Sequence, residues 1–241
     1  MKPFLGLKLC FLIMIWMNRQ KESQEGLLIM HGLTVISSIA FTAVSVLLVK
    51  LLERKIGAGT GGKIGLSFAV PVFILFLTAN MYMINKNAEG SYLILNVLLL
   101  TAVVSSYQDM KYREIEDEIH IAALGAGLMG LVIKGFQPLD AFLGLLAGGG
   151  ILLLIAILTK GGMGGADIKL NAVYGTILGL RLLVLSLVIA FAAGALASLL
   201  LILFRIKNRK DVIPFSPFLS IGALTAFVFG KSIAGIYLGF F

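Results

Sequence analysis

Residues 139–158 read LDAFLGLLAGGGILLLIAIL, an apolar stretch in which Asp140 is the one charged side chain. A helix rises about 1.5 Å per residue, so about 20 apolar residues are enough to cross the hydrocarbon layer of a membrane. Unpaired backbone groups are costly in lipid, and a helix pairs them internally. This stretch therefore predicts a membrane-spanning α-helix.

Stretches of the same kind recur along the whole chain. The 241 residues are 59% hydrophobic and only 13% charged, and the mean hydropathy is +1.01, far from the balance of a soluble domain. Apolar segments lie at 4–17, 27–49, 64–84, 91–108, 119–134, 139–158, 168–180, 182–204 and 217–240. We expect an all-α fold, a polytopic transmembrane helical bundle with eight or nine spans.

The number of spans depends on the first segment. Residues 1–17 contain a basic residue and an apolar stretch, as a secretory signal does, but no small-residue cleavage site precedes Asn18 and Arg19. We expect this segment to be retained as the first span, whereas cleavage would leave eight. The segments at 4–17, 119–134 and 168–180 are short for a full crossing, so each could be tilted or re-entrant.

The basic residues predict the orientation of the chain. The net charge is +8, yet the Lys and Arg residues are scattered between apolar segments, which indicates membrane topology and not a nucleic-acid partner. With a cytoplasmic N-terminus, the cytoplasmic loops hold thirteen basic residues and the opposite loops hold five. The thirteen are Lys2, Lys50, Arg54, Lys55, Lys63, Lys111, Arg113, Lys160, Lys169, Arg205, Lys207, Arg209 and Lys210, and the five are Arg19, Lys21, Lys86, Lys134 and Arg181.

Two carboxylates stand out among twelve acidic residues. Asp109 directly follows the apolar run 91–108, and Asp167 follows the glycine-rich run 161–166. The charge count places both at the cytoplasmic edge of the bilayer, where the intervening helices can bring them together. Position alone also allows two anchoring charges in water. The other acids considered are predicted to be solvated loop charges: Glu22, Glu25, Glu53, Glu89, Asp140 and Asp211.

The pair suits peptide hydrolysis by aspartates. One ionised carboxylate takes a proton from water, and one protonated carboxylate donates to the carbonyl oxygen or the leaving amine. Like charges held a few ångströms apart share one proton, so such a pair occupies both states at once. Asp109 and Asp167 are therefore candidates for a catalytic pair of this kind.

Metal and cofactor sites are not predicted. The chain has one cysteine, Cys10, and two histidines, His31 and His120, which lie far apart in the sequence without partners at metal-ligand spacing. The predicted loop 50–63 is rich in glycine but lacks the glycine–lysine spacing of a phosphate loop. We expect no metal, no nucleotide and no other cofactor.

Three motifs resemble those of a known family. Residues 161–169, GGMGGADIK, resemble the GxGD motif of the type IV prepilin and preflagellin peptidases, whose second catalytic aspartate matches Asp167. Gly164 and Gly165 precede Ala166, which replaces the last glycine of the strict motif with another small residue. Residues without large side chains let the backbone approach other helices and an extended substrate.

The other two motifs flank the first. Residues 109–117, DMKYREIED, resemble the first-aspartate motif, in which Asp109 is catalytic and Asp117 closes the motif, although Glu116 replaces the usual proline. Residues 213–222, IPFSPFLSIG, are similar to the Pro-Phe-x-Pro-Phe segment that opens the last span of bacterial members. Pro214 and Pro217 are expected to support substrate binding, or simply to begin a helix.

The order of the motifs implies a domain division and a function. They cover residues 91–241, which predicts a six-span catalytic core after an N-terminal extension of about three spans at 1–90. The resemblance implies an endopeptidase that removes the basic leader from prepilin-like or pseudopilin precursors, for type IV pili or protein secretion, at the cytoplasmic face of the cell membrane. Lys169 is expected to favour an ionised Asp167 or to meet lipid phosphate.

Several points stay open at this stage. The single cysteine excludes the four-cysteine zinc domain of longer members, and N-methyltransferase activity is left undecided. The alternative function is a small transporter or channel in which Asp109 and Asp167 bind ions or protons, but such proteins show charges deep within spans and repeated halves. An inactive scaffold is a third possibility, which the intact aspartates oppose. Neither the particular precursor nor the oligomeric state is predicted.

Overall fold

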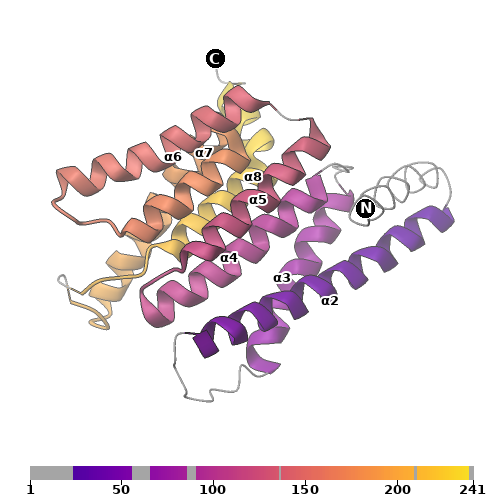
Figure 1. Cartoon of the computed structure of the whole chain (residues 1–241), viewed down its shortest axis with the longest axis horizontal. Coiled ribbons are helices and arrows are strands. Elements are labelled where there is room, and N and C mark those ends of the chain that lie inside the picture. Colours follow the sequence, from indigo (N-terminus) through magenta and orange to yellow (C-terminus); the bar gives the residue numbers. More distant parts are fainter. Residues whose placement is uncertain (1–23, 56–65, 86–90, 136, 209–210, 239–241) are drawn as a thin grey trace. The chain divides into compact units, whose positions relative to one another are not determined.

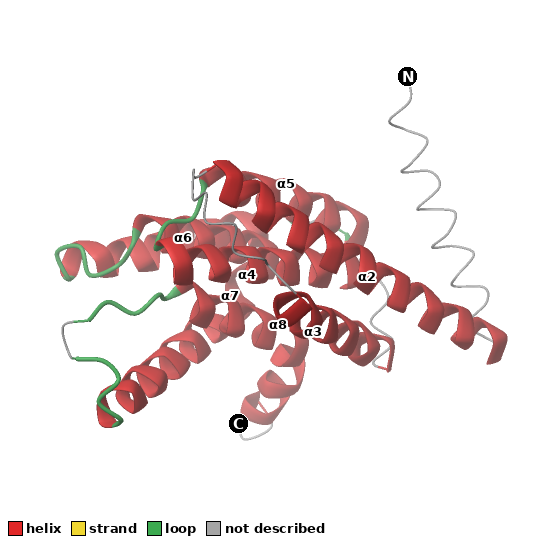
Figure 2. Ribbon diagram, turned by 90° about the horizontal axis from the view of Figure 1, so that it is seen from below, coloured by secondary structure: helices red, strands yellow, loops and turns green. Residues whose placement is uncertain are grey.

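The computed structural model describes residues 24–55, 66–85, 91–135, 137–208 and 211–238, and within these ranges the secondary structure is helical, with no strand (Figures 1 and 2). The predicted first span at 4–17 and most of the glycine-rich loop at 50–63 lie outside the described residues. The helices are α2 (Gln24–Lys55), α3 (Leu66–Asn85), α4 (Tyr92–Tyr112), α5 (Asp117–Lys134), α6 (Pro138–Leu158), α7 (Gly165–Leu203) and α8 (Ser216–Leu238).

The chain divides into two compact units, one of residues 1–46 and 62–88 and the other of residues 47–61 and 89–241. In the first unit, the rings of Phe41 in α2 and Phe76 in α3 stack with centroids 5.9 Å apart, and the Phe76 side chain is fully buried. The Thr34 hydroxyl also donates to the sulfur of Met81. The described residues of the first unit therefore form a packed helix pair. The predicted domain boundary near residue 91 stays a prediction.

Four helices are long and apolar enough to cross a membrane among the residues that the structure describes. These windows are Thr34–Leu51, Tyr92–Tyr112, Pro138–Leu158 and Gly165–Leu203, and the shorter apolar windows are Val70–Tyr82 and Ser216–Gly230. The all-α, multi-span character predicted from the sequence is thus confirmed. The total of eight or nine spans and the six-span core remain predictions.

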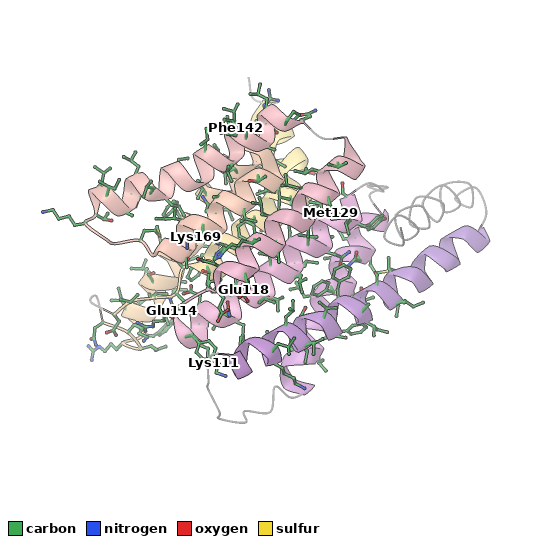
Figure 3. The ribbon with its side chains drawn as sticks, viewed as in Figure 1. Lys111, Glu114, Glu118, Met129, Phe142 and Lys169 are labelled. Carbon is green, nitrogen blue, oxygen red and sulfur yellow. The ribbon has the colours of Figure 1, made fainter. Side chains whose placement is uncertain are left out.

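The second unit is apolar both inside and outside. Its core contains Leu98 of α4, Tyr174 of α7 and Leu219 of α8, all with no exposed side-chain area. Large apolar side chains also cover its surface: Met129 of α5 and Phe142 of α6, both labelled in Figure 3, are each 56% exposed. An apolar exterior is expected where lipid tails are the solvent.

Helix α7 consists of two segments that join at Gly179, whose backbone angles are φ 74° and ψ 170°. The first segment runs in the same direction as α8, because Asp167 contacts Ser216 and Tyr174, farther along α7, contacts Ser220, farther along α8. The chain then reverses. Two separate helices were predicted here, at 168–180 and 182–204, and the structure places their junction at Gly179.

The second segment of α7 runs antiparallel to α8. Leu182, near its start, lies beside Gly230, and the Ser186 carbonyl lies beside Gly222. Gly194, farther along, lies beside the ring of Phe215 at the entry to α8. The loops at 159–164 and 204–215 are consequently at the same end of the bundle, where Figure 2 shows them in green.

Asp140 stabilises this reversal from the first turn of α6. The backbone N–H of Leu180 donates to Asp140 Oδ1 at 3.1 Å, which satisfies a donor at the start of the second α7 segment. A Cβ atom on Gly179 would overlap the same carboxylate. The prediction that Asp140 is a solvated loop charge is therefore wrong, because its side chain is half-buried and caps a helix.

Glycines bring α6 and the first α7 segment into backbone contact. A Cβ on Gly144 would overlap the Gly175 carbonyl, and one on Gly148 would overlap the Asn171 carbonyl. The Asn171 side chain also donates to the Gly148 carbonyl at 2.7 Å. Small residues at helix contacts are expected in lipid, and the backbone contact fixes how the helix that carries Asp167 lies against α6.

Candidate active site

Asp109 lies in the last turn of α4, not after it. The helix continues to Tyr112, and the backbone N–H of Arg113, in the left-handed conformation at φ 59°, donates to the Asp109 carbonyl at 3.0 Å. The apolar run ends at residue 108, but main-chain hydrogen bonding extends the helix by one more turn. Asp109 therefore projects from a rigid helix and is only 9% exposed.

Asp167 lies in the first turn of α7, where Gly164 is the N-cap residue. Backbone N–H groups at a helix N-terminus favour a carboxylate nearby. A Cβ on Gly164 would lie 3.2 Å from Asp167 Oδ2, whereas nothing lies close to Gly165, and the Ala166 side chain packs against the core. Glycine at 164 thus leaves space beside one oxygen of Asp167.

Ser216, the first residue of α8, joins the two carboxylates. Its backbone N–H donates to Asp109 Oδ2 at 2.9 Å, and its hydroxyl donates to Asp167 Oδ1 at 2.7 Å. Ser216 has no exposed area. One residue of a third helix therefore holds both aspartates, which are 58 positions apart in the sequence, in a single constellation.

A cavity of about 670 Å³ opens beside the aspartates. It is lined by the α4–α5 connection, the glycine-rich loop before α7 and the segment that enters α8: Asp109, Arg113, Glu114, Ile115, Asp117, Gly162, Met163, Gly164, Gly165, Ala166, Asp167, Lys169, Val212, Ile213, Pro214 and Phe215. All three sequence motifs thus contribute to one space.

Lys169 pairs with Asp117 across the mouth of this cavity. Lys169 Nζ lies 2.6 Å from Asp117 Oδ1, and both side chains are more than half exposed. The hydrogen bond from Lys169, together with its charge, holds the pKa of the Asp117 carboxyl below its usual range. Lys169 and Glu114 are labelled at this end of the bundle in Figure 3. The ion pair therefore joins Asp117, the last residue of the 109–117 motif, to Lys169, the last residue of the 161–169 motif.

Lys169→Ala is expected to reduce activity by less than about fivefold, because an exposed ion pair contributes little to stability. Its partner substitution, Asp117→Asn, should have an effect of similar size. Both can be measured as initial rates of cleavage of a precursor by protein in lipid. A loss as large as that of Asp167→Asn would mean that Lys169 acts on the aspartates directly.

The structure gathers most of the residues predicted from the sequence. Pro214 lines the cavity, whereas Pro217 does not appear in its wall and occupies the first turn of α8, where a residue without an N–H is tolerated. Ser216 was missed, because a serine between two prolines carries no chemical signal by itself. Its position at the start of a helix within the third motif was the available clue.

The arrangement can activate water between two carboxylates. Each aspartate accepts one hydrogen bond from Ser216, which leaves its second oxygen available to share a proton or to bind water. In the described part of the chain, no group of three His, Cys, Asp or Glu side chains is placed to hold a metal ion. The chemistry that this site offers through its own side chains is acid–base chemistry by two carboxylates.

Comparison with protein families identifies the part of the chain that contains both aspartates. Residues 94–199 match the type IV leader peptidase family. The family resemblance predicted from the three motifs is confirmed. Residues 94–199 form the leader peptidase segment, which ends before the third motif and therefore does not include Ser216.

Individual curated proteins are similar to part of the chain. A prepilin leader peptidase/N-methyltransferase from Bacillus subtilis is 36% identical over 106 residues, 42% of this chain and 43% of the relative. Proteins of the same name are 35% identical over 152 residues in Aeromonas salmonicida, covering 60% of this chain and 52% of the relative, and 31% identical over 153 residues in Legionella pneumophila, covering 61% and 53%.

The chain thus spans about half the length of the curated relatives it matches. No solved structure matches it significantly.

Proposed function

We propose that this protein is a membrane-embedded aspartyl endopeptidase that removes the basic leader from type IV prepilin-like precursors. The observation that carries the proposal is the constellation of Asp109, Asp167 and Ser216 beside the cavity: two carboxylates on different helices accept hydrogen bonds from one residue. The leader peptidase segment, which contains both aspartates, supplies the substrate class.

The reaction begins with one aspartate ionised and the other protonated. The ionised carboxylate takes a proton from a bound water while the water oxygen bonds to the carbonyl carbon of the scissile peptide. The protonated carboxyl donates its proton to the carbonyl oxygen, which gives a tetrahedral intermediate. The intermediate then returns that proton to the second aspartate, the first aspartate protonates the amide nitrogen, and the C–N bond breaks.

The cavity supports a basic leader as the ligand. Its wall contains the four acidic residues Asp109, Glu114, Asp117 and Asp167 and the two basic residues Arg113 and Lys169. The excess of acidic groups would attract a segment rich in Lys and Arg. The apolar helix of the precursor would stay in lipid beside the exposed apolar face of the bundle. The excess of basic residues on one side of the predicted topology supports a cytoplasmic position for this site.

The transporter alternative and a second enzymatic activity have weaker support. Both aspartates lie in the terminal turns of their helices, not in the middle of a span, where ion-coupling carboxylates of transporters are found. The curated relatives are named N-methyltransferases as well, but the chain spans only about half of their length. We therefore propose the peptidase activity alone.

The test is cleavage of prepilin-like precursors by the purified protein in lipid, with a panel that includes pilin and pseudopilin leaders. The unmodified protein should release the leader at its junction with the apolar helix, and Asp109→Asn and Asp167→Asn should not. If the folded, unmodified protein cuts no member of the panel, the peptidase proposal is wrong.

A further inference from the structure

We infer that Ser216 is a positioning residue that assigns different roles to the two aspartates: Asp109 as the first base and Asp167 as the first acid. The inference rests on the proposed peptidase function. It follows from the two different groups with which Ser216 holds the carboxylates, the backbone N–H on Asp109 Oδ2 and the side-chain hydroxyl on Asp167 Oδ1. Ser216 lies outside the leader peptidase segment.

The two contacts differ in what they can do. A backbone N–H can only donate, so any proton on Asp109 must lie on its other oxygen, Oδ1. A serine hydroxyl can donate or accept, so it can serve Asp167 both as a carboxylate and as a carboxylic acid. The shared proton is therefore accommodated best on Asp167, whose hydrogen-bond partner can adapt to either protonation state.

Burial strengthens the two hydrogen bonds that Ser216 makes to the aspartates. Ser216 has no exposed area and each aspartate is 9% exposed, so water competes little for these hydrogen bonds. Bonds to charged groups in such surroundings are the stronger ones. When Asp167 gives its proton to the carbonyl oxygen of the substrate, the Ser216 hydroxyl can donate to the new carboxylate, as it does to Oδ1 in the structure. The hydroxyl thus stabilises the charge that forms during the first step.

Variants of Ser216 separate its two contacts. Ser216→Ala keeps the backbone N–H to Asp109 and removes the hydroxyl from Asp167, whereas Ser216→Thr keeps both groups. Ser220→Ala is the matched control: Ser220 is a serine of the same helix, 3% exposed, whose hydroxyl contacts Tyr174 at 2.9 Å and not an aspartate. A merely structural role of Ser216 would make the alanine variants at 216 and 220 behave alike.

The experiment is the pH profile of precursor cleavage by the full-length protein in lipid. Ser216→Ala should lower kcat by roughly tenfold, the effect of one lost hydrogen bond to a charged group, with KM unchanged and the alkaline limb of the profile displaced. Ser216→Thr should restore both the rate and the profile, and Ser220→Ala should keep the unmodified profile. An unaltered rate and profile in Ser216→Ala, or the same displacement in Ser220→Ala, would overturn the inference.

A second readout does not require cleavage. Infrared difference spectra of the protein at a series of pH values should contain the carboxyl band of Asp167. This band should be absent in Asp167→Asn. In Ser216→Ala this band should titrate at a different pH from that of the unmodified protein, and in Ser220→Ala at the same pH. If this band titrates at the same pH in Ser216→Ala as in the unmodified protein, the role of Ser216 is refuted, even if no precursor is cut. The positioning role and the peptidase function can therefore fail separately.

Discussion

Asp109→Asn combined with Asp167→Asn will leave about the same residual cleavage as either substitution alone. Each single change should reduce kcat by about 10² to 10⁴, the usual contribution of a positioned acid or base. In the proposed mechanism the two carboxylates act as a unit, because the base produces the nucleophile that the acid then helps to add. The loss of either one therefore removes the contribution of both. Initial rates for the three variants measure this directly.

Asparagine keeps the shape of aspartate, and its amide oxygen can still accept the hydrogen bond from Ser216. The variants should therefore remain folded, which circular dichroism and gel filtration in detergent can verify. Rates that fall multiplicatively, with the double variant slower by the product of the two single effects, would mean that the aspartates contribute independently. The shared-proton mechanism would then be wrong.

Gly144→Ala should destabilise the protein by about 3 kcal/mol or more, at the upper end of the effects of overpacking. The added Cβ would overlap the Gly175 carbonyl, and neither backbone can move without displacing a helix. Because the first α7 segment carries Asp167, the same substitution should also reduce cleavage. The free energy of unfolding in lipid–detergent bicelles is the measurement.

Gly150→Ala is the matched control in the same helix. Nothing lies within 4 Å of the position that its Cβ would occupy, and alanine is favoured over glycine in a helix by up to about 1 kcal/mol. This variant should be as stable as the unmodified protein or slightly more stable. If both glycine variants lose the same stability, backbone contact between α6 and α7 is not the cause.

Helix positions in the second unit were largely predictable from hydropathy. The predicted segments 91–108, 119–134 and 139–158 correspond to α4, α5 and α6, because a helix in lipid needs a continuous apolar run. The ends were less predictable, since a helix can continue through polar residues, as α4 does past Asp109. The role of Asp140 was missed because its partner, the Leu180 N–H, is distant in the sequence and belongs to the backbone.

The site could be predicted from the sequence where a motif contains the side chain that lines it. It could not be predicted where a backbone group makes the contact. Asp109, Asp167 and Asp117 were found from their motifs, and the structure places all three in the wall of one cavity. Lys169 was expected beside Asp167 or lipid phosphate, but it pairs with Asp117, a choice that only the three-dimensional approach of α5 and α7 decides. Ser216 acts partly through its N–H, which every residue except proline possesses.

The contacts of Ser216 also bear on biosynthesis. The chain is made from its N-terminus, so Asp109 and Asp167 are both synthesised before the residue that holds them together. Until α8 has entered the bundle, the two carboxylates lack their common hydrogen-bond donor. Under the proposed function, the catalytic constellation is therefore complete only once α8, the last helix of the described chain, is in place.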